Sequence, residues 1–242
     1  MKKIIFSLVT LLSLNAFSQE TIPAKDPGAK DRELSGSFTA IAVTDGIDVY
    51  LTQGQTESVS VMAADEKYLT RFKSEVVSGT LKLYYDNNGI NFGFNEKRKL
   101  KAWVTCRNLN KMTISGGADI KSGGTLDVDR LEMRVTSGAH FVGKVNAKDL
   151  DVDQSSGSGV TMSGRADKIK VEGNSASIFK GYDLVVDYCE AKASSGAGVH
   201  VTINKELNAK ANSGGGIRYK GEALIKDLSV SSGGVVKKEK SK

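Results

Sequence analysis

The sequence predicts an all-β protein: a parallel β-helix (solenoid) of short coils with an irregular N-terminal β section and one short helix. A Ser/Gly-rich turn recurs about every 19 residues in the C-terminal half, and apolar residues alternate with polar ones on both sides of it. The 242 residues include 26 Gly and only 2 Pro. Alternation indicates strands with one buried face, and a turn repeated at a fixed period is typical of a solenoid.

Residues 1–18 have the pattern of a secretory signal peptide. Lys2 and Lys3 precede an apolar run from Ile4 to Leu14, and small residues before Gln19 suit a signal peptidase. The run is too short for a membrane-spanning helix, which needs about 20 residues. We therefore expect an exported protein in the periplasm, on the outer cell surface or secreted, with no transmembrane segment in the mature chain.

The next segments are predicted to be a flexible leader, residues 19–33, and an N-terminal β section that caps the solenoid, residues 34–110. The leader contains both prolines and many charges. In the cap, apolar alternation interrupted by Asp45-Gly46 predicts strands, and residues 65–72 predict the short helix. Solenoids need such caps because their terminal coils would otherwise expose the core.

Residues 111–236 are predicted to form the Ser/Gly-turn β-solenoid, followed by a charged tail, residues 237–242. The turn sequences are Gly116–Ile120, Ser137–Phe141, Ser156–Val160, Asn174–Ile178, Ser195–Val199, Ser213–Ile217 and Ser232–Val235. Gly and Ser suit sharp corners, where the backbone needs positive φ and leaves little room. An antiparallel hairpin meander is the competing arrangement, but turns at one phase of a long repeat favour parallel coils.

Cys106 and Cys189 are predicted to be free thiols. They lie about four coils apart in the sequence, or roughly 20 Å at about 4.8 Å per coil. A disulfide requires Cα atoms within about 7 Å. Cys189 occupies the inward position equivalent to Leu131 and should behave as a small core residue.

No catalytic, cofactor-binding or metal-binding residue is predicted. His140 and His200 lie about three coils apart, too far to share a metal ion, and the Ser-rich turns lack the strand–helix context of a nucleophile elbow. The net charge of +6 is scattered without a basic stripe, which argues against nucleic-acid binding.

Acidic residues alternate along the coils and should lie on the outer face. They are Asp127, Asp129, Asp149, Asp151 and Asp153, and the neighbouring basic residues are Lys148, Lys168, Lys170 and Arg134. Polysaccharide-cleaving β-helices use acidic clusters with calcium or as general acids. Because basic neighbours can pair with these carboxylates, we expect a solvated face of mixed charge.

Aromatic residues gather in one section of the cap and are the candidate ligand contacts. They are Tyr84, Tyr85, Phe92, Phe94 and Trp103. Tyr84 and Tyr85 must point to opposite faces of their strand. Exposed rings here could stack on sugars, and packing within the cap is the alternative.

Three segments resemble a known family. They are Gly46–Gly54, Asp65–Leu69 and Ser213–Gly221, and they are similar to the exported bacterial family called putative autotransporter adhesin, head GIN domain, which is common in Bacteroidetes and has no known function. The resemblance runs from about residue 38 to 235. It implies a β-helical fold with an irregular N-terminal section, and it offers no catalytic residues to carry over.

The functional expectation is an exported, non-catalytic β-solenoid that serves as a cell-envelope or secreted binding module of adhesion type. Its ligand is unknown, with a surface glycan or an envelope protein as the candidates. Two alternatives remain open: a polysaccharide-active β-helix enzyme, and a structural element that self-assembles through its solenoid edges.

Overall fold

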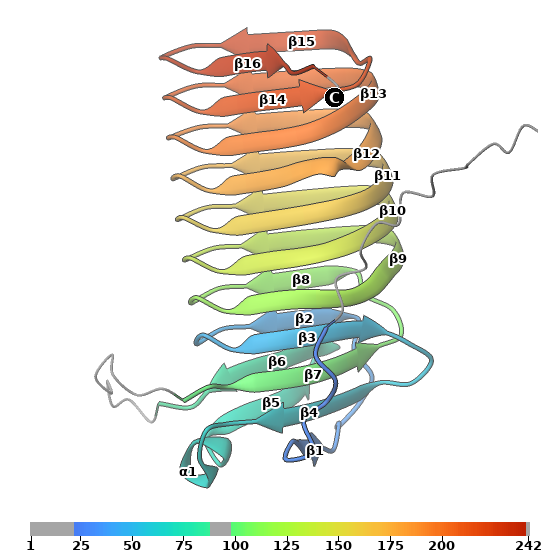
Figure 1. The fold of residues 1–242 in the computed structure, drawn as a ribbon, viewed down its shortest axis with the longest axis vertical. Helices are drawn as coiled ribbons and strands as arrows, with labels where there is room; N and C mark the ends of the chain where they lie inside the picture. The colour runs from blue at the N-terminus through green and yellow to red at the C-terminus, as the bar shows by residue number, and fades with distance from the viewer. Residues whose placement is uncertain (1–21, 88–97, 241–242) are drawn as a thin grey trace, which may run out of the picture.

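The structure is a computed structural model that describes residues 22–87 and 98–240, so the predicted signal peptide lies outside the described residues. Two sheets face each other along one tall stack (Figure 1). The strands are β1 (Lys30–Arg32), β2 (Ala40–Val43), β3 (Asp48–Gln53), β4 (Ser58–Met62), β5 (Phe72–Val77), β6 (Thr80–Tyr85), β7 (Lys101–Cys106), β8 (Lys111–Ile114), β9 (Asp119–Val135), β10 (His140–Gln154), β11 (Gly159–Gly173), β12 (Ile178–Ala193), β13 (Gly198–Ala211), β14 (Gly216–Lys220), β15 (Leu224–Val230) and β16 (Val235–Lys238).

From β9 to β13 the chain climbs one level per coil, and each strand pairs in parallel with the next. The predicted parallel β-helix is therefore confirmed. Each of these strands begins in the front sheet of Figure 1, bends at one corner without leaving the ladder, and ends in the back sheet. Register irregularities, such as the one between Val142 and Lys144, accompany the bend, as expected where a bulge turns a strand.

The Ser/Gly turns form the other corner. Ser137 and Gly138 have φ values of 57° and 69°, and the Ala139 amide donates to the Thr136 carbonyl over 3.2 Å. Two positive φ values with this bond define a type I′ turn. Such turns usually close hairpins, but here each one connects the two facing sheets. Successive turns also bond to one another, as where the Gly138 amide donates to the Ser156 carbonyl over 3.0 Å.

The degenerate turn is aligned one residue later than the sequence suggests. Ser175 and Ala176 carry the two positive φ values, 50° and 59°, so Ser175 rather than Asn174 is the equivalent of Ser137. Sequence comparison misplaces this copy because Ala176 stands where the other coils have Gly. An L-residue with a Cβ atom is strained in this conformation, so we expect this turn to be less stable than the turns that have Gly at the same position.

The N-terminal section is woven into the stack. β2 lies between β6 and β8, and β3 lies between β7 and β9, all in parallel. The chain first forms one level with β2 and β3, then the lower levels at the N-terminal end of the stack, and β8 and β9 then pair on the other side of the first level. Because these partners are distant in sequence, the local pattern predicts the strands but not this order.

Antiparallel strands and the helix close the N-terminal end (Figure 1). β1 pairs with β4, and β5 pairs with β6, so residues 30–32 of the predicted leader form a strand. The helix α1 (Glu66–Leu69) is shorter than predicted. Asp65 caps it by accepting a bond from the Lys67 amide over 3.0 Å. At the other end, β16 extends to Lys238 because β14 provides a parallel partner.

The core is a single set of inward rows between the sheets. Leu131, Leu150, Ile169, Cys189 and Leu207 occupy one such row on successive levels. Both cysteines are free, as predicted, and Cys189 lies in the core as expected; Cys106 is also buried. Burial raises the pKa of Cys189 to about 12 and, together with smaller effects, that of Cys106 to about 11.

Candidate functional site

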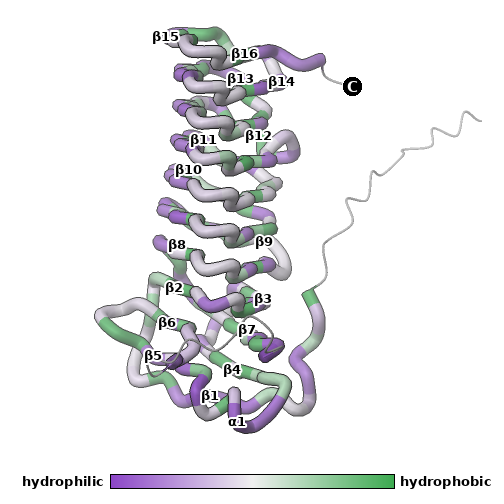
Figure 2. Tube along the Cα trace, turned by 90° about the vertical axis from the view of Figure 1, so that its left-hand side faces the viewer, coloured by the Kyte–Doolittle hydropathy of each residue, from purple (hydrophilic) through white to green (hydrophobic). Residues whose placement is uncertain are grey.

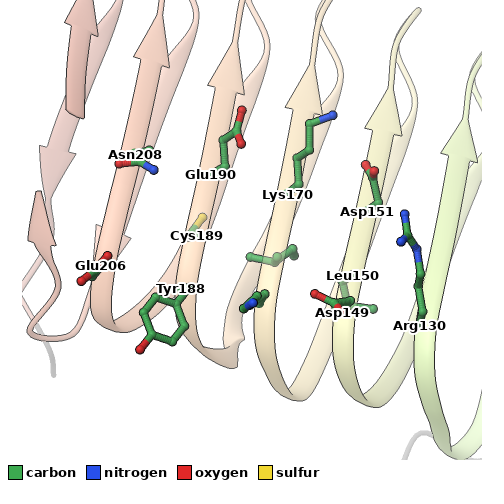
Figure 3. Close-up of a pocket in the computed structure, with 12 residues that line it drawn as sticks. Arg130, Asp149, Leu150, Asp151, Lys170, Tyr188, Cys189, Glu190, Glu206 and Asn208 are labelled. Atoms are coloured by element: carbon green, nitrogen blue, oxygen red, sulfur yellow. The ribbon is translucent and has the colours of Figure 1, made fainter. Parts of the chain in front are cut away.

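The outward side of the back sheet carries a shallow hollow of about 320 Å³ (Figure 3). We call it the Tyr188 hollow. Its floor is Leu150, Ile169 and Cys189, and its walls are Arg130, Asp149, Asp151, Lys168, Lys170, Tyr188, Glu190, Glu206 and Asn208. The lining comes from five consecutive levels, so residues about 19 apart in the sequence lie side by side.

The repeat explains how the walls are built. Arg130, Asp149, Lys168, Tyr188 and Glu206 stand in register on successive strands. The second wall follows two residues later along each strand, since alternate residues of a strand point to the same face. Residues that are about 19 positions apart in the sequence therefore stack in a row along the solenoid axis, about 4.8 Å from one another.

Tyr188 is the exposed aromatic residue of the hollow. It is 39% exposed, and the Lys205 ammonium lies 5.4 Å from the centre of its ring. The labelled side chain projects from the ribbon beside charged groups on neighbouring strands (Figure 3). A ring with one open face, bordered by hydrogen-bonding side chains, suits a flat and polar ligand.

Charges beside the hollow are compensated. Lys192 contacts Glu172 at 2.8 Å and Glu190 at 3.0 Å, and Lys226 contacts Glu206 at 3.6 Å. The pKa of Lys170 is raised, first by its hydrogen bond with Glu172 and then by the charge of Asp151. The pKa of Glu172 is lowered, chiefly by its hydrogen bond with Lys192. These contacts confirm the expected mixed-charge face and favour ionised carboxylates.

The acidic rows at the bend follow the same pattern. Lys148 contacts Asp129 at 2.7 Å, and the Asn146 amide donates to Asp127 over 2.9 Å. Within residues 22–87 and 98–240, no group of three or more His, Cys, Asp or Glu side chains is arranged to hold a metal ion.

The two histidines lie on the outer face of the front sheet, three levels apart. His140 contacts Asp119 at 3.1 Å, and the His200 ring stacks on Tyr182 at 5.1 Å between centres. Burial, aided by the charges of Arg218 and Lys180, lowers the pKa of His200. Their separation along the stack agrees with the spacing inferred from the sequence.

The aromatic residues singled out in the sequence do not form one site in the described structure. Tyr85 is buried, with the Arg98 guanidinium 4.1 Å from its ring centre. Tyr84 points outward, to the opposite face from Tyr85 as predicted, and its hydroxyl donates to Glu75. Trp103 belongs to the other sheet. Phe92 and Phe94 lie outside the described residues.

Trp103 is partly covered by the N-terminal segment. Its indole N–H donates to the Pro23 carbonyl over 3.1 Å, and its ring lies 5.5 Å from that of Tyr50. This supports the packing alternative for Trp103. Tyr188 was missed because it lies in the regular part of the repeat. The available signal was an aromatic residue at an outward position whose equivalents on the neighbouring coils are all charged.

The protein is a β-solenoid with a shallow hollow on its lateral face. The chain belongs to the family described as "Putative auto-transporter adhesin, head GIN domain", whose model matches residues 37–223. The family resemblance inferred from the sequence is thereby confirmed. No helix in the described parts of the chain is long and apolar enough to cross a membrane.

Solved structures share the fold at low sequence identity. A protein described as a putative adhesin from Bacteroides fragilis is 19% identical, with a TM-score of 0.79 over 90% of this chain and 99% of its own. One with the same description from Parabacteroides merdae is 16% identical, with a TM-score of 0.68 over 88% and 95%. A protein from Parabacteroides distasonis described as a putative lipid binding protein is 19% identical, with a TM-score of 0.60 over 88% and 96%. None of the curated proteins matches the chain.

Proposed function

We propose that the chain is an exported, non-catalytic adhesion module that binds a surface glycan through the Tyr188 hollow. The observation that carries the proposal is the half-open tyrosine ring set among alternating positive and negative side chains on a rigid sheet. Sugars present apolar ring faces edged by hydroxyl groups, which can both donate to carboxylates and accept from ammonium groups. Family membership supports the adhesion role.

The polysaccharide-active enzyme is less well supported. A general acid must be protonated near neutral pH, which requires an apolar or anionic environment. In the hollow, Glu190 and Glu206 have ammonium groups within 4 Å, and Asp151 lies near Lys170. Such surroundings stabilise carboxylates and therefore suit recognition better than proton transfer.

A glycan array screened in parallel with a reducing-sugar assay tests the proposal. We expect the wild-type chain to bind some of the glycans without releasing new reducing ends. Tyr188→Ala should weaken this binding about tenfold, the loss of roughly 1.4 kcal/mol typical of a moderately important aromatic contact. Ile178→Ala is the matched control, since Ile178 is 41% exposed but belongs to the front sheet.

Two results would oppose the proposal. Release of reducing ends from any polysaccharide would establish catalysis. Binding that Tyr188→Ala leaves intact would place the recognition surface elsewhere.

A further inference from the structure

The C-terminal end of the stack exposes the core. Eight large apolar side chains remain substantially exposed in the described chain, and five of them belong to the last level. They are Leu224, Ile225, Leu228, Val230 and Val235. Figure 2 shows hydrophobic residues on β15 at this end of the stack.

Three of them are exposed because no further coil covers them, whereas Leu224 and Val235 stand in register with the outward positions of Glu206 and Gly216. Ile225, Leu228 and Val230 stand in register with Leu207, Ala209 and Ala211 of β13, which are all buried. They are therefore core positions of an incomplete layer. β15 and β16 also leave one backbone edge without a strand partner in the described structure. Free edges with apolar side chains are templates for pairing with another chain.

The opposite end cannot provide the missing layer. β1, β4, β5 and α1 close it with antiparallel strands and a helix (Figure 1). β1 and β5 are edge strands, but Val77 is the one large apolar side chain exposed at this end among the described residues. Head-to-tail association would therefore leave most of the apolar layer without an apolar partner, whereas an interface between two C-terminal ends is closed and pairs this layer with itself.

The order of residues in β15 is self-complementary. Lys226 contacts Glu206 at 3.6 Å and Asp227 lies 4.0 Å from Lys210, so both point outward at the local bulge, between the inward Ile225 and Leu228. A twofold axis between Lys226 and Asp227 would place Ile225 of one copy opposite Leu228 of the other. The same axis would place each Lys226 opposite an Asp227, and opposite charges on facing positions stabilise strand pairs.

We propose that two copies of this chain associate through their C-terminal ends, with β15 of one copy pairing antiparallel with β15 of the other. The interface buries the exposed apolar layer and satisfies both free edges. It closes at two copies, unlike the self-assembling structural element considered from the sequence. The inference is independent of what the Tyr188 hollow binds.

The dimer has a geometric consequence for recognition. Tyr188 lies two levels below Leu224, so the two hollows are about 24 Å apart along the stack, or five strand spacings of about 4.8 Å. A twofold axis perpendicular to the sheets keeps both hollows on one face. A linear ligand can then engage both, which raises its apparent affinity without any new contact.

Light scattering coupled to size exclusion, across a concentration series of the exported chain, tests the dimer. We expect wild type to be dimeric and Leu228→Lys to raise the dissociation constant at least about tenfold, because it introduces a charge into the buried layer. Ile178→Lys is the matched control and should dimerise as wild type does. Circular dichroism confirms that each variant is folded.

Cross-linking provides a second readout that does not depend on Leu228. Asp227→Cys should form a disulfide-linked dimer on oxidation, because the twofold arrangement places the two copies of residue 227 within about 7 Å. Asp129→Cys, whose native side chain is 84% exposed, should form no disulfide-linked dimer, and the native cysteines are buried. Three results would overturn the proposal: a monomer at the highest soluble concentration, a dimer that Leu228→Lys leaves unchanged, or oligomers that keep growing with concentration.

Discussion

Gln154 is a polar residue in an apolar core, and replacing it should stabilise the protein. It lies at an inward position of β10 and is fully buried. Neither its amide nitrogen nor its amide oxygen has a hydrogen-bond partner, and its neighbour in the row is Val135. We expect Gln154→Met to raise the free energy of unfolding, because methionine keeps the length of the side chain and removes both unpaired groups.

The size of the effect follows from the cost of burying an unpaired amide. Mutational data place that cost at about 1–3 kcal/mol. In a chain of this size each kcal/mol changes the melting temperature by about 2–4 °C. Gln154→Met should therefore raise the melting temperature by roughly 2–12 °C.

Gln53→Met is the matched control. The Gln53 side chain donates to the carbonyls of Arg107 and Asp127, each over 3.0 Å, and accepts from the Asp127 amide over 2.7 Å. Its loss should lower the free energy of unfolding by roughly 1–3 kcal/mol. Thermal and urea unfolding measure both variants. If Gln154→Met destabilises the protein as Gln53→Met does, the buried amide of Gln154 makes hydrogen bonds and the expected gain in stability is wrong.

Three further predictions concern the turns, the thiols and the acidic face. Ala176→Gly should raise the free energy of unfolding by about 1 kcal/mol, because glycine relieves the positive φ; an unchanged urea midpoint would contradict this. Both thiols should be inert to Ellman's reagent until unfolding. Burial raises the pKa values of both thiols in the folded protein above the ordinary 9.0, so the free energy of unfolding should fall as pH rises from about 9 towards 11. The fall should be smaller in Cys189→Ala. An equal fall in this variant would show that the Cys189 thiol does not cause the pH dependence. Wild type and Asp151→Asn should each melt at the same temperature in calcium and in chelator, and a shift of many degrees between the buffers in wild type that Asp151→Asn abolishes would reveal a metal site.

Much of the fold could be predicted because the repeat is local. Each coil contains a turn at the same position of the repeat and strands with alternating apolar residues. The sequence therefore predicts the length of one coil and the inward positions of Leu131 and Cys189. The type of the turn and its role in the fold could not be predicted from the sequence. Type I′ turns are associated with hairpins, and only the three-dimensional stack reveals that they can also join facing sheets.

The N-terminal weave and the hollow depend on long-range pairing. Nothing near β2 specifies that it lies between β6 and β8, since all three strands carry similar alternating patterns. Likewise, Tyr84 and Trp103 are close in sequence but belong to different sheets, so their proximity along the chain does not create a site. Tyr188 differs from its surroundings only when it is compared with the equivalent residues of the neighbouring coils, which lie about 19 positions away in the sequence.

A ligand bound along the Tyr188 hollow would contact residues that lie one coil apart in the sequence. Backbone amide shifts can be followed by NMR as a glycan that binds is titrated into a chain of residues 19–242. We expect perturbations at residues near 130, 149, 168, 188 and 206, recurring at the period of the coils, and little change in the Ser/Gly turns. Perturbations confined to one continuous segment, or to the front sheet, would contradict a ligand lying along the Tyr188 hollow.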